Sequence, residues 1–135
     1  MLRGMATVNF YADDLEAAKD WYSELFGIAP YFQVPGGYYE FRIGDYHHEF
    51  GIINRAYAPA AASREPGGAI VNWHVDDITA VFDRLLELGA KEWEPITKRG
   101  DSGFVTASVV DPFGNVLGIM TNPHYLEVLA KTGSA

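Results

Sequence analysis

His74 is the side chain best suited to acid–base chemistry in this sequence. It lies just before a pair of aspartates, and an imidazole can give or take a proton near neutral pH. Glu49 and Glu40 are carboxylates that could act as bases or recognise a cationic group. The alternatives are a hydrogen-bonded structural role for His74 and an ion pair between Glu40 and Arg42. His74 and Glu49 are therefore the candidate catalytic residues.

Other reactive combinations have less support. The adjacent His47 and His48 would point to opposite faces of a strand, so they cannot both serve one site. Together with Glu49 they leave a displaced metal site as an open alternative. The sequence contains no cysteine, so neither a disulfide nor thiolate chemistry is available. It also lacks a Ser-His-Asp order, a phosphate-binding glycine loop and a dinucleotide fingerprint.

An internal repeat positions the candidate residues. Residues 7–15 read TVNFYADDL, and residues 70–78 read IVNWHVDDI. Each copy passes from a β-rich run through an aspartate pair into an amphipathic helix. A short carboxylate can accept from the free N–H groups of a first helical turn. The expected N-caps are one aspartate of each pair: Asp13 or Asp14, and Asp76 or Asp77.

The order of elements in each half is predicted to be β-α-β-β-β. Helices are expected over 15–26 and 78–88, where apolar side chains recur at helical spacing and a glycine follows. Short strand-like runs follow each helix: 31–34, 38–43 and 49–53 in the first half, and 91–93, 104–110 and 116–120 in the second. One turn of helix through Leu129 and a frayed end are expected in the tail.

These elements are expected to form one domain of the α+β class. Its parts are a first module at about 5–55, a linker at about 56–68, a second module at about 69–121 and a C-terminal tail at 122–135, so that the domain spans 1–135. A half of about 50 residues cannot close a core alone, whereas two packed copies can. The two sheets would then enclose a cleft.

Strand alternation predicts which side chains face that cleft. The helix must cover the apolar set of the first strand, because successive side chains point to opposite faces. The polar residues left on the cleft side of three strands are Asn9 and Tyr11, Asn72 and His74, and Tyr38, Glu40 and Arg42. Apart from His74, these are predicted ligand-binding residues.

The motifs together resemble the vicinal oxygen chelate superfamily. The first half carries FYADDLEAAKDWY at 10–22 and LFG at 25–27, and the second carries HVDDI at 74–78, LGA at 88–90 and DPFGN at 111–115. Members include glyoxalase I, extradiol dioxygenases, methylmalonyl-CoA epimerase, fosfomycin-resistance proteins and bleomycin-binding proteins. The resemblance implies paired βαβββ modules forming a cupped mixed sheet around a small-molecule cleft, and a homodimer. It also assigns Glu49, Gly51 and Gly118 to the cleft.

The positions that hold the metal in metal-dependent members carry unsuitable residues here. Those members place a His or similar ligand about seven residues before the Asp that opens each helix, and a Glu or other ligand after the last turn of each module. The corresponding residues are Thr7, Ile70, Gly51 and Gly118, which cannot supply the nitrogen and carboxylate ligands of a divalent cation. We therefore expect no metal and no cofactor. The sequence is most similar to a glyoxalase-like branch related to lactoylglutathione lyase.

The two glycines predict extra room in the cleft, because a strand glycine leaves space for a ligand to approach. The first functional hypothesis is a protein that binds a small organic molecule at Gly51, Gly118 and the polar set without the standard metal. The second is a metal-independent lyase or isomerase that uses His74 or Glu49, with Tyr11 as a further candidate, on a carbonyl compound. The third is a metal-dependent lyase or dioxygenase with ligands relocated to residues drawn from His47, Glu49, His74 and Glu40.

Composition narrows the partners and the location. The formal net charge is −8 and no Lys/Arg cluster occurs, which argues against nucleic acid and anionic membranes. No apolar run approaches the roughly 18 residues of a membrane span. The first residues, Met1–Gly4, contain no hydrophobic stretch of signal-peptide length, so a cytoplasmic location is expected.

Overall fold

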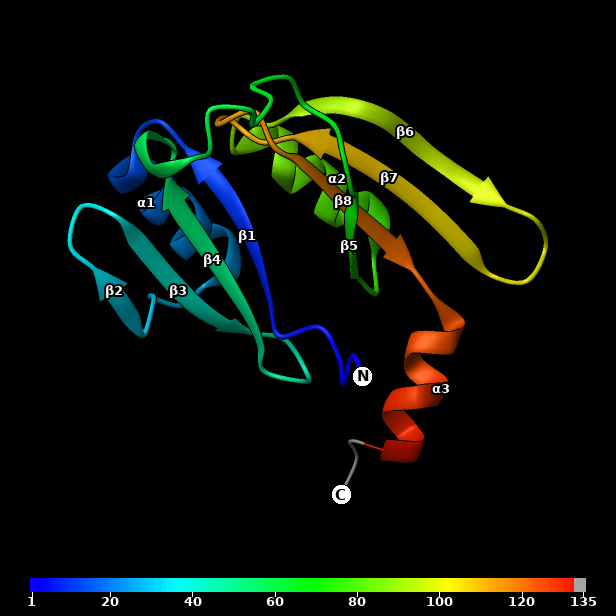
Figure 1. Cartoon of the computed structure of the whole chain (residues 1–135). Coiled ribbons are helices and arrows are strands. Elements are labelled where there is room, and N and C mark those ends of the chain that lie inside the picture. The colour runs from blue at the N-terminus through cyan, green and yellow to red at the C-terminus, as the bar shows by residue number, and fades with distance from the viewer. Residues whose placement is uncertain (133–135) are drawn as a thin grey trace. The chain divides into compact units, whose positions relative to one another are not determined.

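The structure is a computed structural model that describes residues 1–132, and it divides into two compact units, Met1–Ala62 and a second that begins at Ser63. The elements of the first unit are β1 (Thr7–Ala12), α1 (Leu15–Phe26), β2 (Phe32–Val34), β3 (Tyr38–Ile43), β4 (His48–Asn54) and the short η1 (Arg55–Tyr57). Those of the second unit are β5 (Val71–His74), α2 (Ile78–Glu87), β6 (Lys91–Arg99), β7 (Phe104–Val110), β8 (Val116–Thr121) and α3 (Pro123–Thr132) (Figure 1). The predicted α+β class and the β-α-β-β-β order are confirmed.

The two sheets have the same topology. The strand order is β1-β4-β3-β2 in the first and β5-β8-β7-β6 in the second. In each sheet the first strand of the unit runs parallel to the last, and the remaining pairs are antiparallel. The internal repeat in the sequence is therefore a repeat of the whole mixed sheet.

Equivalent aspartates begin the two main helices. The Asp14 side chain accepts from the backbone N–H of Ala17, and the Asp77 side chain accepts from that of Ala80, each at 3.0 Å. Each bond satisfies a first-turn donor that has no partner inside the helix. Gly27 ends α1 in a left-handed conformation with φ 71°, which glycine adopts without steric cost. The second aspartate of each predicted pair is thus the N-cap.

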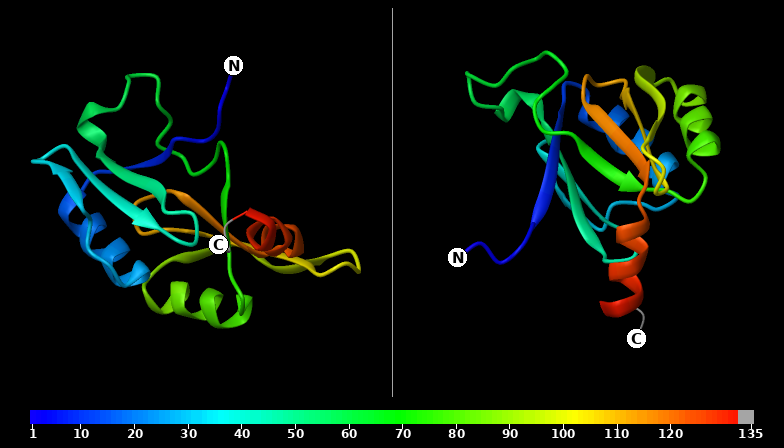
Figure 2. Two further views of the ribbon diagram at one scale, coloured as in Figure 1. Left: turned by 90° about the horizontal axis from the view of Figure 1, so that it is seen from below. Right: turned by 90° about the vertical axis from the view of Figure 1, so that its right-hand side faces the viewer.

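The helices α1 and α2 each cover one face of the sheet in their own unit, as the ribbon views show (Figure 2). In the first unit Tyr22 of α1 is only 1% exposed, and its ring lies 6.3 Å from Phe10 and 5.1 Å from Phe50. Tyr39 donates a hydrogen bond of 2.6 Å to Glu16 of α1. The predicted phase of β1 and β3 is therefore correct: Phe10 and Tyr39 lie on the helix side.

Two elements are longer than expected. The strand predicted at 91–93 continues to Arg99 as β6, even though Pro95 lies within it. An edge strand with register shifts tolerates proline, because the backbone N–H that proline lacks is not needed there for the ladder of hydrogen bonds. The tail forms a helix of ten residues, Pro123–Thr132, rather than a single turn. The frayed end expected in the tail lies, at 133–135, outside the described residues.

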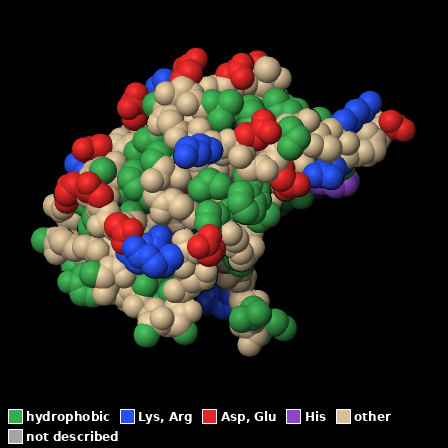
Figure 3. All heavy atoms as spheres, turned by 90° about the horizontal axis from the view of Figure 1, so that it is seen from above, with side chains coloured by type: hydrophobic (Ala, Val, Ile, Leu, Met, Phe, Trp, Pro, Cys, Tyr) green, Lys and Arg blue, Asp and Glu red, His purple; other side chains and the backbone are tan. Residues whose placement is uncertain are grey.

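Charged side chains are mixed over the surface. On the face drawn in Figure 3, acidic groups are scattered among basic and hydrophobic side chains. Within residues 1–132, no helix is long and apolar enough to cross a membrane.

Candidate functional site

The face of the first sheet opposite α1 carries a row of candidate residues. The register places Asn9 of β1 beside Gly51 of β4, and Gly51 beside Glu40 of β3. Glu49 lies on the same face of β4, because it is two residues from Gly51 and strand side chains alternate. We call this surface the open face of the first sheet.

Two polar pairs form on the open face. The Tyr38 hydroxyl donates a hydrogen bond of 2.7 Å to Oε1 of Glu40. Arg42 places Nη2 at 3.2 Å from Oε1 of Glu49. Arg42 is thus paired with Glu49, and its charge also acts on Glu40. Arg42 and Glu49 are direct cross-strand partners, a position in which opposite charges meet most readily.

Two groups of this cluster, Glu40 and Tyr38, have raised pKa values. Burial raises the pKa of the Glu40 carboxyl, and the neighbouring Glu49 carboxylate raises it further, whereas Arg42 lowers it. Burial is also the main cause that raises the pKa of the Tyr38 hydroxyl, with Thr7 and Arg42 acting in the opposite direction. A carboxyl group held towards its protonated form beside a phenol is a common feature of functional sites.

Gly51 does not leave the free space that its lack of a side chain predicts. A Cβ atom built at this position would lie 2.5 Å from Oδ1 of Asn9 and closer still to the Tyr38 hydroxyl. These two side chains therefore occupy the volume that a larger residue at 51 would take. The expectation of extra room is wrong here, because neighbouring rotamers fill the space.

The second unit repeats this arrangement. Asn72 of β5 pairs with Gly118 of β8, and Gly118 pairs with Ser108 of β7. A Cβ atom at Gly118 would overlap Oδ1 of Asn72, so an asparagine again covers the glycine. Ser108 is 3% exposed, and its hydroxyl has no hydrogen-bond partner among the described residues. Sequence reasoning missed Ser108, although its place opposite Gly118 follows from the register.

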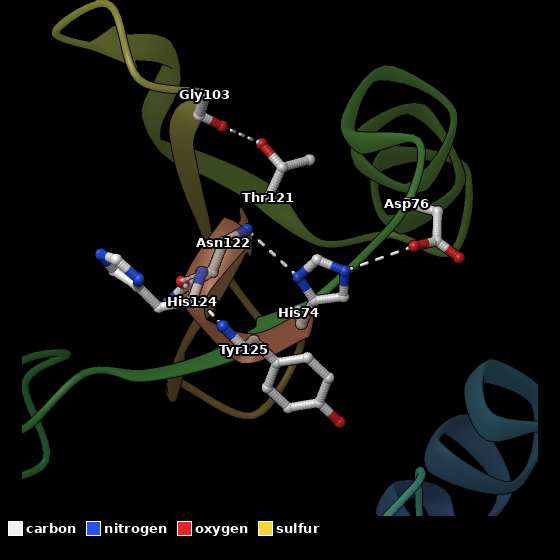
Figure 4. Close-up of polar contacts among 7 residues, drawn as sticks. All are labelled: His74, Asp76, Gly103, Thr121, Asn122, His124 and Tyr125. Atoms are coloured by element: carbon white, nitrogen blue, oxygen red, sulfur yellow. Dashed lines mark hydrogen bonds and ion pairs between the residues drawn. The ribbon is translucent and has the colours of Figure 1, made fainter. Parts of the chain in front are cut away.

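His74 lies under the start of α3 (Figure 4). Its Nδ1 accepts a hydrogen bond of 3.1 Å from the backbone N–H of Asn122, and its Nε2 lies 3.3 Å from Oδ1 of Asp76. The ring stacks on Tyr125 at 4.8 Å between centroids. His74 and Asn72 share a face of β5, as alternation predicts, but both ring nitrogens of His74 already have partners. This geometry favours a structural role for His74.

Tyr11 also has a partner that the sequence did not indicate. The Arg55 guanidinium lies 5.7 Å from the centre of the Tyr11 ring, and its Nε is 3.5 Å from Oδ1 of Asp13. Arg55 follows β4 directly, and β4 runs beside β1. The end of one strand thus covers the aromatic residue at the end of the other.

Within residues 1–132, no three His, Cys, Asp or Glu side chains gather at a spacing that could hold a metal ion. His48 packs its ring at 5.5 Å from that of Tyr46. His47, its neighbour, has φ 52° in the turn before β4.

A shallow hollow lies elsewhere in the first unit. It has a volume of about 500 Å³ and is lined by residues of α1, of the loop before β2, of β2 and of β3, which include Lys19, Tyr31 and Tyr39. None of the predicted ligand-binding residues lines it. The hollow borders the open face, because Tyr31 and Phe32 in its lining also contact Arg42 and Tyr38 of that face.

Comparison with known proteins gives one family. Residues 4–119 match the family model described as Glyoxalase/Bleomycin resistance protein/Dioxygenase superfamily. A glyoxalase-related enzyme from Fulvimarina pelagi superposes with a TM-score of 0.71 at 24% identity, covering 90% of both chains.

Two further solved structures share the fold. Lactoylglutathione lyase from Agrobacterium tumefaciens gives a TM-score of 0.67 at 21% identity, covering 90% of this chain and 95% of that one. Fosfomycin resistance protein FosX from Mesorhizobium loti gives a TM-score of 0.68 at 17% identity, covering 95% of this chain and 99% of that one. No curated protein is similar enough to this chain to count as a match.

Proposed function

This chain belongs to the glyoxalase/bleomycin resistance protein/dioxygenase superfamily, and we propose that it binds a small organic molecule on the open face of its first sheet. The observation that carries this proposal is the polar cluster centred on Gly51. It presents a carboxyl group with a raised pKa, Glu40, next to a phenol and an arginine–carboxylate pair. A few convergent polar groups of this kind are what fix the orientation of a small ligand.

Aromatic surface beside the cluster supports the same proposal. The Phe32 ring lies 6.4 Å from that of Tyr38 in an edge-to-face arrangement, and Phe32 is 49% exposed. The Arg42 guanidinium lies 5.2 Å from the centre of the Tyr31 ring. Apolar ring surface next to polar groups suits an organic molecule that has both characters.

The donor set at the family's metal positions supports a metal-free site. Thr7 offers only a hydroxyl, and Gly51 offers no side chain. The volume at Gly51 is taken by the Asn9 amide and the Tyr38 hydroxyl, which are weak donors for a divalent cation compared with imidazole and carboxylate. These residues do not fit the metal, so binding is assigned to the organic ligand and the side chains alone.

Proton transfer on a carbonyl compound is the second candidate function. It is favoured by the 2.7 Å hydrogen bond from Tyr38 to Glu40 and by the raised pKa of Glu40. A carboxyl group that titrates closer to neutrality is better able to take and return a proton. Glu49 is held by Arg42 and His74 by two partners, so Glu40 fits the role of proton carrier better than either predicted catalytic residue.

Ligand screening by NMR tests the proposal. Isotope-labelled protein is titrated with a fragment library, and the expected result is a set of amide shifts confined to Asn9, Glu40, Gly51 and their strand neighbours. Glu40→Gln should weaken the hits, whereas the control Glu92→Gln on β6 should not. Hits that map away from the open face would contradict the proposed site.

Two measurements separate the candidate functions. Elemental analysis of gently purified protein should find no stoichiometric divalent metal; about one zinc, iron, nickel or manganese ion per chain would contradict the metal-free assignment. Incubation of carbonyl compounds in heavy water, followed by NMR, detects exchange of their C–H protons. If the protein catalyses this exchange and Glu40→Gln lowers its rate by roughly 100-fold or more, the protein is an enzyme and not only a binding protein.

A further inference from the structure

The last helix is attached to the second unit mainly through its first turn. α3 contains no buried residue among those the structure describes, and in Figure 1 it extends from the end of β8. Asn122 caps it, since its side-chain oxygen accepts from the N–H groups of His124 and Tyr125 at 2.9 and 3.2 Å. The backbone N–H of Asn122 itself is bound by His74. His74 therefore fixes the residue on which the helix begins.

That hydrogen bond requires a neutral imidazole. A backbone N–H can donate only to a ring nitrogen without a proton, so the bond to Nδ1 leaves the proton of the neutral ring on Nε2. Nε2 is the atom that faces Asp76, and an N–H there can donate to the carboxylate. Protonation adds a hydrogen to Nδ1, which then points at the N–H of Asn122. Two donors then face each other and the bond is lost.

We propose that His74 is a pH-sensitive anchor of α3: the neutral ring holds the start of the helix, and the protonated ring releases it. This inference is independent of the proposed ligand site, because it concerns only contacts within the second unit. The side chain of His74 is only 9% exposed. While the first turn of α3 stays in place, water therefore cannot readily replace the lost hydrogen bond. Release of the first turn restores hydration to both donors.

Two further groups contact the ring, one at Nε2 and one on its face. Asp76 attracts an imidazolium, but its side chain is 93% exposed, so solvent and salt screen the pair. Tyr125 stacks on the ring, and because it belongs to the first turn of α3 it moves with that turn. On the sheet, the neighbours of His74 on its own face are Met120 and then Thr106, which carry no charge. The Thr106 hydroxyl accepts a hydrogen bond of 3.0 Å from Nε of Arg99 on β6, and that guanidinium is paired with Glu94 at 3.8 Å.

Contacts at the end of β8 confine the change to α3. Thr121, the last residue of β8, donates a hydrogen bond of 3.2 Å to the carbonyl of Gly103. The ring of His124 lies 5.3 Å from that of Phe104, and this contact belongs to the first turn that opens. Figure 4 shows His124 directed away from His74, and it pairs instead with Glu127 at 3.2 Å. The expected change is therefore opening of the first turn of α3 while the sheet stays intact.

Hydrogen exchange of the full chain tests this anchor. Exchange of the Asn122 amide and of the first turn of α3 is measured at about pH 7.5 and about pH 5, which spans the range in which imidazoles titrate. After correction for intrinsic rates, their protection should fall roughly tenfold at the lower pH, the factor expected for one lost hydrogen bond. The amides of α2 serve as an internal reference and should keep their protection.

Two variants and one measurement on the unaltered chain make the result decisive. His74→Asn keeps an oxygen acceptor near the position of Nδ1 and cannot titrate there, so the protection of α3 should no longer depend on pH. His124→Gln removes the exposed histidine of α3 and should retain the full response. If His74→Asn does not fold, the ring nitrogens of His74 are followed by NMR, and the ring and the Asn122 amide should titrate together. Protection that is equal at both pH values, a response lost in His124→Gln, or separate titrations would overturn the proposal.

Discussion

Adding one methyl group at position 51 tests how tightly the open face is packed. In Gly51→Ala the new Cβ would lie 2.5 Å from Oδ1 of Asn9 and closer still to the hydroxyl and ring edge of Tyr38. Ordinary contacts begin near 3.4 Å, so the tyrosine ring must move by about 1 Å. The ring cannot swing freely, because Tyr38 is half-buried and donates to Glu40.

The size of the effect follows from three contributions. Overpacking of this kind costs about 1–3 kcal/mol, and weakening the hydrogen bond from Tyr38 to Glu40 adds about 0.5–1.5 kcal/mol. The alanine returns about 0.4–1 kcal/mol by restricting the unfolded chain, since Gly51 does not need a positive φ. These contributions sum to a net loss of folding stability of about 0.5–4 kcal/mol, centred near 2 kcal/mol.

Gly118→Ala is the matched control in the second unit. Its Cβ would overlap the amide of Asn72, with Cγ of Asn72 at 2.9 Å and Cγ2 of Ile70 at 3.1 Å. Asn72 is exposed, so its amide can rotate away into solvent at little cost. The small cost of moving Asn72 and the gain from restricting the unfolded chain nearly cancel. The change in folding stability should therefore stay within about 1 kcal/mol.

Urea unfolding followed by circular dichroism measures both variants against the unaltered chain. A double variant, Gly51→Ala with Tyr38→Ala, isolates the contact: removing the ring should return at least about 1 kcal/mol of the loss caused by the methyl group. Equal stabilities for Gly51→Ala and Gly118→Ala, or no coupling to Tyr38, would refute the assignment of filled space at Gly51.

Removing the ring in Tyr22→Ala should lower the unfolding free energy by about 3–5 kcal/mol, because Tyr22 is fully buried; calorimetry measures it, and a loss below about 1 kcal/mol would contradict the core assignment. Asp14→Ala and Asp77→Ala should each cost about 1 kcal/mol in denaturant titrations, since each removes one N-cap bond, and unequal losses would argue against equivalent caps. Folding raises the pKa of Glu40 above its ordinary 4.5, so the folded state binds that proton more tightly and stability falls as pH rises above this value; Glu40→Gln should flatten this dependence in unfolding measured across the acid range. Light scattering at micromolar concentration should find a homodimer, as the family resemblance implies, and a monomer would contradict that expectation.

Sequence alone located the local structure well. The bounds of α1, β3 and β7 agree with the predicted ranges 15–26, 38–43 and 104–110, because helical spacing, capping residues and strand alternation all act over a few neighbouring residues. The same alternation correctly placed Phe10 under the helix and Asn9 on the opposite face. Family membership also followed from short motifs, and it is confirmed by the match over residues 4–119.

Pairing between strands was harder to predict. Arg42 meets Glu49 only because the hairpin register sets them opposite each other, and a shift of one residue would move one of them to the other face. The length of β6 was underestimated for a related reason. Pro95 disfavours a central strand, but only the sheet shows that β6 lies at an edge, where proline is tolerated.

The sequence determined which residue types stand at each strand position, and the tertiary structure decided what those side chains contact. His74 and Asn122 are far apart in the chain, so their hydrogen bond arises only when β5 and β8 pair and α3 begins beside them. Gly51 looked like open space, because a glycine has no side chain to fill it. Its neighbours Asn9 and Tyr38 fill that volume instead, since side-chain rotamers are selected by packing across strands and not by the order of residues along one strand.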